Sequence, residues 1–131
     1  MLEPYQRAAL IPNEPGMSWH HFMRGRFVDS EIPAAKDASL ALVIQMMEQQ
    51  GQTLAHIRGL VERSLGLSLQ VVAEFVGQIN LESRDISIHQ RQPEKAYTGQ
   101  ISENGRVIVL YEAGEAKPIH LVHEETLAQL V

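Results

Sequence analysis

YTGQISENGRVIVLYE, residues 97–112, is the stretch of sequence that decides the fold. Apolar and polar residues alternate up to Ile101, the pair Asn104-Gly105 follows, and an apolar run starts at Val107. Such alternation is typical of a half-buried strand, and Asn-Gly supplies the left-handed conformations that tight hairpin turns require. The stretch therefore predicts a β-hairpin with its tip at Asn104-Gly105.

Two further strands are predicted beside this hairpin. DISIHQR, residues 85–91, alternates before it, and PIHLV, residues 118–122, follows the turn at 113–117. HEETLAQLV at the end predicts a short terminal helix. Residues 85–131 thus read as a four-stranded antiparallel meander whose one apolar face is expected from Ile86, Ile88, Ile101, Val107 and Val109.

Helical spacing dominates residues 34–82, where three helices are predicted. Residues 34–50 carry an apolar stripe that ends before Gly51, a typical C-terminal cap. A second helix is predicted over 53–65 and a third from Ser68 to about Asn80. The stripe residues of the first helix are Leu40, Val43, Ile44 and Met47, and those of the third are Leu69, Val72, Ala73, Val76 and Ile79.

Residues 1–33 are predicted to form an irregular arm, because they hold four of the six prolines and no sustained periodicity. Aromatic residues and arginines gather in its second half. Large aromatics and arginine dominate the energetics of protein interfaces, so this half is predicted to be an anchor packed on the core or a contact surface, and not a free tail. The candidate interaction residues are Trp19, Phe22, Arg24, Arg26 and Phe27.

The fold class that follows is α+β. The arm precedes a single α+β domain at 34–131, in which a helical part (34–82) packs on the meander part (85–131). The apolar stripe of the first helix is the expected cover for the sheet.

Composition excludes several classes of protein. The chain has 131 residues, a formal net charge of −5 and no cysteine, so thiolate metal sites and disulfides are impossible. The apolar runs are shorter than the roughly 20 residues that a membrane helix needs. An acidic chain without a basic cluster disfavours nucleic-acid binding, and a chain without cysteine suits the cytoplasm.

Two histidines near the C-terminus, His120 and His123, are weak candidates for metal ligands. Positions three apart in a strand point to opposite faces, and zinc needs three or four convergent ligands. Glu124 and Glu125 are explained by the start of a helix, where acidic residues face the positive end of the dipole. KPIHLVHEETLAQL is therefore read as a strand-to-helix junction with half-exposed surface histidines, and no cofactor is predicted.

The segment LQVVAEFVGQINLESRDI, residues 69–86, has a partial helix-turn-helix pattern. Ser83 stands where the recognition helix should bury an aliphatic residue, and the segment is not basic. An ordinary amphipathic helix is the favoured interpretation, and a DNA-binding regulator stays a lesser alternative.

AYTGQISENGRVIVLYEAGEAKPIHLVHEETL, residues 96–127, resembles the small strand-rich domain of plasmid-encoded Kfr B proteins. The shared features are a Tyr-x-Gly opening, a central strand pair and a strand that ends in His before a charged helix start. The likeness covers about a quarter of the chain. It implies a bacterial mobile-element origin and no particular function.

These observations favour a small non-enzymatic interaction or regulatory protein that binds a protein partner or a second copy of itself. The sequence contains neither a G-x-S-x-G elbow nor an H-E-x-x-H motif, so catalysis is disfavoured. The alternative is a small metal-binding or enzymatic module built on the histidines.

Overall fold

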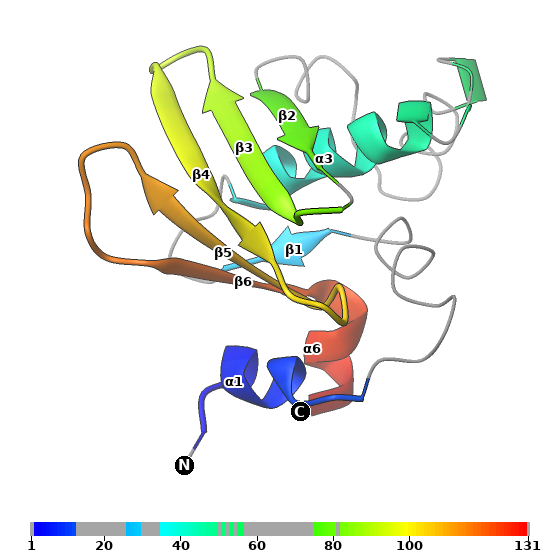
Figure 1. The fold of residues 1–131 in the computed structure, drawn as a ribbon, viewed down its shortest axis with the longest axis vertical. Coiled ribbons are helices and arrows are strands. Elements are labelled where there is room, and N and C mark those ends of the chain that lie inside the picture. The colour runs from blue at the N-terminus through cyan, green and yellow to red at the C-terminus, as the bar shows by residue number, and fades with distance from the viewer. Residues whose placement is uncertain are drawn as a thin grey trace.

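The computed structural model describes residues 2–12, 26–29, 35–49, 51, 53, 55–56, 75–80 and 82–130, and the account below concerns these residues. Helices and strands are mixed along the chain, and the strands form one curled antiparallel sheet (Figure 1). The α+β class is thereby confirmed. The elements are α1 (Pro4–Ala9), β1 (Phe27–Val28), α3 (Ala35–Gln49), β2 (Phe75–Ile79), β3 (Asp85–Gln90), β4 (Lys95–Ile101), β5 (Val107–Glu112), β6 (Ile119–His123) and α6 (Glu124–Leu130).

The sheet has six strands in the order β1-β6-β5-β4-β3-β2. Each strand from β2 to β5 pairs with its successor, so β2 to β6 form a meander, and β1 adds to its far edge beside β6. The four strands predicted after residue 84 and the short terminal helix are confirmed. The sheet is larger than predicted because β1 and β2 extend it at both edges.

The hairpin between β4 and β5 has its tip where Asn104-Gly105 predicts it. Ser102 N donates to Val107 O at 2.8 Å, and Gly105 N donates to Ser102 O at 3.0 Å. Gly105 has a φ of 70°, whereas Arg84 is the one non-glycine residue with positive φ in the described part of the chain. The tip is therefore a four-residue loop with one left-handed residue, and Asn104 serves it through its side chain.

Helix α3 covers one face of the sheet and forms the larger core with it. Leu40, Val43 and Met47 of the predicted stripe are buried, and Gly51 ends the helical segment with a φ of 85°. The helix lies close to β2, where a Cβ on Gly77 would come within 2.9 Å of the backbone of Ala41 and Leu42. The remaining buried side chains of this core include Phe27, Leu42, Met46, Phe75, Ile79, Ile86, Ile88, Ile101, Ile108, Leu110 and Leu121.

The prediction of a third helix up to Asn80 is wrong over residues 75–79, which form strand β2. Phe75 and Ile79 are buried against α3, while Val76, counted in the helical stripe, is 39% exposed. The burial of residues 75–79 thus follows the two-residue period of a strand and not the 3.6-residue period of a helix, because β2 extends the sheet beside β3. The same finding overturns the helix-turn-helix interpretation, since β2 and β3 are an antiparallel hairpin. Residues 68–74 and nearly all of the predicted second helix lie outside the described residues.

The predicted apolar face is wrong for β5. Ile86, Ile88 and Ile101 face α3 as expected, but Val107 is buried on the opposite face, in a cluster that Val109 joins. The α3 side of β5 is supplied by Ile108 and Leu110. The register is hard to read from sequence because β5 is apolar at successive positions, as strands covered on both faces are.

The second face of the sheet is covered at one end by α1 and α6, which lie side by side (Figure 1). Ala8 of α1, Val107 and Val122 are its buried apolar residues, and Leu127 and Leu130 of α6 pack on them. The prediction of an irregular arm over 1–33 is therefore wrong at two places, since residues 4–9 are helical and residues 27–28 join the sheet. Pro4 and Gln6 explain the helix: proline suits the first helical position, and Gln6 Oε1 accepts from Glu3 N at 2.8 Å.

Among the helices in the described ranges, none has the length and apolar character to cross a bilayer.

Candidate functional site

A groove of about 700 Å³ opens on the second face of the sheet, next to α1. One wall is α1, and the opposite wall is made by the β2–β3 and β4–β5 turns. The floor comes from β5, because alternation along that strand places every second side chain on this face. Its lining residues are Tyr5, Gln6, Ala9, Arg84, Gly99, Gln100, Ile101, Ser102, Glu103, Val107, Val109, Tyr111 and His120.

The floor is apolar and partly open to solvent. Val107 is buried, Val109 is half-buried, and Tyr111 is 43% exposed. Gly99 lies beside Leu110 in the sheet, and a Cβ on it would collide with the Val109 carbonyl group. The strands are thus unusually close under the groove, and glycine at position 99 is what allows it.

His120 of β6 joins the floor to α1. Its ring stacks on that of Tyr5, with centroids 3.6 Å apart and planes inclined by 10°. Burial lowers the pKa of His120, and the Asp29 carboxylate opposes this by a smaller amount. The imidazole is therefore preferentially neutral, as a stacked and partly desolvated ring should be.

The opposite wall carries charged and polar groups. Arg84 Nη1 lies 3.8 Å from Glu103 Oε1, so the two turns are joined by an exposed ion pair. Gln100 Nε2 donates to Asp85 Oδ1 at 2.9 Å, and the hydrogen bonds from Gln100 and Ser83 lower the pKa of Asp85. Arg84 reaches this position from a left-handed backbone conformation with a φ of 64°.

Asn104 fastens the β4–β5 turn to α1. Its Nδ2 donates to Ala8 O at 2.8 Å and to Ile11 O at 3.0 Å, which are carbonyls at the end of α1. Its Oδ1 accepts from Ser102 Oγ at 2.6 Å and from Arg106 N at 3.2 Å. The side chain is buried and fully engaged, so it holds the wall of the groove in place.

The two predicted metal-ligand candidates lie on opposite faces of the sheet. His120 faces the groove, whereas His123 lies among the α3-side residues, with its ring edge-on to Phe27 at 5.2 Å. The structure does not bring them together. Within the described ranges, no three His, Asp or Glu side chains are grouped so as to hold a metal ion.

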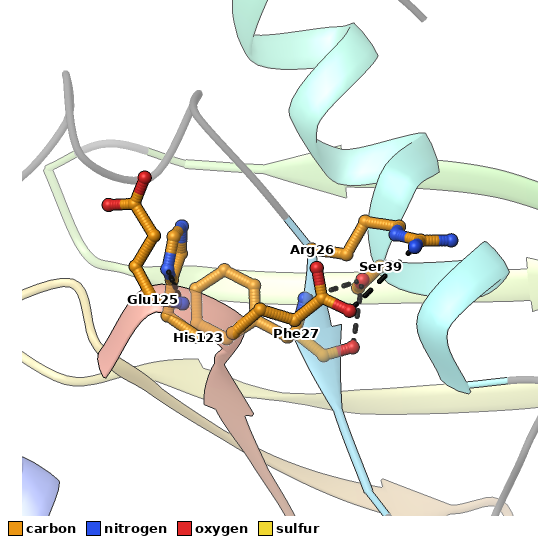
Figure 2. Close-up of polar contacts among 6 residues, drawn as sticks. Arg26, Phe27, Ser39, His123 and Glu125 are labelled. Carbon is orange, nitrogen blue, oxygen red and sulfur yellow. Dashed lines mark hydrogen bonds and ion pairs between the residues drawn. The ribbon is translucent and has the colours of Figure 1, made fainter. Parts of the chain in front are cut away.

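His123 marks the junction where β6 ends and α6 begins. Its Nδ1 accepts a hydrogen bond from Glu125 N at 3.3 Å, so the imidazole caps the helix and its other nitrogen carries the proton (Figure 2). The predicted strand-to-helix junction is confirmed. The expectation that both histidines are half-exposed is wrong for His123, which is fully buried because the strand ends inside the core.

Two of the candidate interaction residues are described, and both are built into the fold. Phe27 is fully buried, and its backbone N–H donates to Ser39 Oγ at 3.0 Å while Ser39 Oγ donates to Phe27 O at 3.2 Å (Figure 2). Arg26 Nη2 lies 3.7 Å from Glu124 Oε1. Trp19, Phe22 and Arg24 lie outside the described residues.

Sequence reasoning missed Tyr5, Arg84, Asn104 and Tyr111 as site residues. A signal for α1 existed, since Glu3-Pro4 with Gln6 is a helix-start pattern that would place Tyr5 on a helix. The Asn-Gly pattern predicts a backbone role for Asn104 in the turn and does not predict that its side chain contacts α1. Nothing in the sequence predicts that the β2–β3 turn meets the β4–β5 turn at Arg84.

Comparison of the chain with protein-family models, with curated proteins and with solved structures found no match.

Proposed function

We propose that this protein is a non-enzymatic binding module that receives a short segment of a protein partner in the groove beside α1. The observation that carries the proposal is the groove's combination of an open apolar floor with an aromatic and charged rim. Binding sites commonly join an apolar surface to a few placed polar groups that fix orientation.

The arrangement of the groove supports a peptide-like ligand. Val109 and Tyr111 offer apolar contact along β5, while Arg84, Glu103 and Gln100 offer polar groups of both signs on one side. Tyrosine and arginine are enriched among residues that dominate interface energetics. Complementary charges on a partner would set the orientation and the association rate more than the affinity.

The cellular location and the origin of the protein are part of the same proposal. The lack of cysteine suits a reducing compartment, so we place the protein in the cytoplasm. The resemblance of residues 96–127 to a plasmid-encoded domain supports a bacterial mobile-element origin.

A photo-crosslinking experiment tests the proposal. The full chain is expressed in its source organism with benzoylphenylalanine in place of Tyr111, and irradiation is expected to yield a discrete adduct with a protein. An adduct with a second copy of the chain would identify self-association as the form of binding. The exposed position Glu115, in the neighbouring turn, is the control site for the same photoreactive residue.

The decisive measurement is whether the yield of the adduct at position 111 depends on an open groove. Ala9→Trp places a large ring at an exposed lining position and should abolish the adduct at 111, because it fills the groove without replacing a buried residue. Gln129→Trp, at an exposed position of α6, should leave the adduct unchanged. Equal adduct yields from 111 and 115, or an adduct that survives Ala9→Trp, would contradict the proposal.

A further inference from the structure

The wall of the groove formed by α1 has few buried contacts. The helix has six residues, and Ala8 is its one buried residue. An isolated helix of this length does not persist in water, because nucleation costs more than a single turn returns. The helical state of residues 4–9 therefore depends on docking against the sheet.

Most of the interactions that hold α1 are polar or accessible to water. Arg7 Nη2 donates to Leu130 O at 2.8 Å in an exposed setting, and the buried Asn104 donates to two carbonyls at the helix end. The Tyr5 ring stacks on His120 at the edge of the groove. The exposed Arg7 bond and the ring stack at the groove edge exchange readily for equivalent interactions with water or another chain, whereas the buried Asn104 donors need the carbonyls of an incoming segment in place of those of α1.

The surface beneath α1 is apolar and continuous with the groove. Val107 and Val122 pack against Ala8, and Val107 also lines the groove. Tyr5, Gln6 and Ala9 separate this covered strip from the open floor at Val109. Undocking of α1 would join the two into one longer apolar trough.

The residues of α1 indicate what the strip accepts. Tyr5 and Ala8 are three positions apart, so they lie on one face of the helix, with the small residue at the closest approach and the aromatic ring against His120. Asn104 adds donors for the carbonyls at a helix end. The docking surface is thus shaped for one helical turn with an aromatic residue three positions before a small one.

We propose that α1 is a displaceable lid, and that a short helical segment of a partner with this aromatic-x-x-small pattern replaces it on the sheet. The inference rests on the proposed function, because it names the kind of partner segment that the groove and the strip together bind. The tethered lid competes at an effective concentration on the order of millimolar, so it sets a threshold that the partner must exceed.

The test supplies α1 in trans to the full chain. A fluorescent peptide of residues 2–12 is titrated against the wild type and against Ala8→Glu, which puts a charge at the one buried position of the lid. We expect the peptide to bind Ala8→Glu at least about tenfold more tightly than the wild type, because the resident helix no longer competes. Leu10→Glu, which adds the same charge at a position 71% exposed, should bind like the wild type.

Two outcomes would contradict the proposal that α1 is a displaceable lid. One is equal or undetectable peptide binding to Ala8→Glu and wild type. The other is amide hydrogen exchange in which residues 4–9 of the wild type are protected as strongly as β5. If Ala8→Glu does not fold, Tyr5→Ala takes its place, because it removes the ring stack of the resident helix on His120 and leaves the docking surface intact. Faster exchange of α1 and tighter peptide binding than wild type are the expected result, and unchanged values are the refutation.

The two proposals fail separately. Trans binding of the peptide without any partner adduct at position 111 would keep the lid and remove the proposed function. A groove-dependent adduct at 111 with no peptide binding to the lid variants would keep the function and remove the lid.

Discussion

The two faces of the sheet differ in how they are covered. Among the described residues, sixteen buried side chains from α3 and all six strands form one cluster on the α3 face, whereas three form the cluster between α1 and the sheet. The first face is closed by a fifteen-residue helix, and the second by two short helices that leave a groove beside them. Burial of apolar area is the main source of folding free energy, so the α3 face holds most of it.

Under the proposed function, this difference separates stability from binding. A face that is tightly packed tolerates little change, because even one lost methylene is felt in a close-packed core. The proposed lid, α1, is held by one buried alanine, a ring stack and hydrogen bonds, so on this proposal it exchanges with another segment without unfolding of the rest. Such a division explains how a small chain can keep a stable sheet and still offer an adaptable surface.

The largest expected loss of stability comes from substitutions at two adjacent residues of β6, whose side chains lie on opposite faces of the sheet. Leu121→Ala, on the α3 face, should lower the free energy of unfolding by about 3 kcal/mol, because it leaves a cavity in the larger core. Val122→Ala, on the α1 face, should cost about 1.5 kcal/mol for its two methyl groups. Urea unfolding of both variants measures the difference. Equal losses would show that the two faces contribute alike.

A smaller effect is expected at the tip of the β4–β5 hairpin, on the α1 side. Gly105→Val should destabilise the protein by about 2 kcal/mol, because a β-branched residue resists the φ of 70° that the turn requires. Gly105→Asn is the matched control, since asparagine tolerates the left-handed conformation. Thermal unfolding should rank wild type, Asn and Val in that order, and an unchanged melting temperature for Val would refute the role of this turn.

The sequence predicts the α3 face better than the α1 face, and the reason is periodicity. The stripe from Leu40 to Met47 and the alternation in β3 and β4 each have one buried side, so a single period describes them. In β5 both sides are covered, and the alternation disappears. At β2 the spacing fits both periods, and the pairing with β3 settles which one applies.

The candidate site is less predictable, because its parts meet only in three dimensions. Tyr5 and His120 are separated by most of the chain, and so are Ala8 and Asn104. Sequence spacing carries no information on such contacts. His123 illustrates the partial case: the junction at the end of β6 is predictable, while its burial and capping role depend on where the strand meets the core.

The third prediction tests the fastening of α1 through Asn104. Asn104→Ala should cost about 1 to 2 kcal/mol, because a buried and a part-buried carbonyl lose their donor and the turn loses an acceptor. The change should be local: amide exchange should accelerate in residues 4–9 and stay unchanged in β3. Glu82→Ala, at an exposed position of the β2–β3 turn, is the control. Uniform acceleration across β3 and α1 would show that the two faces are not separable.

The smallest effect concerns pH and the Tyr5–His120 stack. Burial lowers the pKa of His120 below its ordinary value of 6.5, although Asp29 opposes the shift. The unfolded chain therefore takes up this proton at a higher pH than the folded chain does. The stability that the neutral imidazole contributes is complete above the unfolded-state pKa, and it declines as the pH falls from there to the folded-state pKa. Wild type should thus lose stability on acidification through this window.

His120→Phe isolates that contribution from the other five histidines of the chain. The variant keeps an aromatic ring against Tyr5 but has no proton to bind, so its stability should fall less between about pH 7.5 and about pH 5.5 than that of the wild type. Urea midpoints of both proteins at the two pH values give the difference, and the Tyr5 ring signals report whether the stack opens in parallel. A steeper acid dependence in the variant would mean that protonated His120 stabilises the α1 face, through Asp29 or the tyrosine ring, and that burial is not the dominant influence on this imidazole.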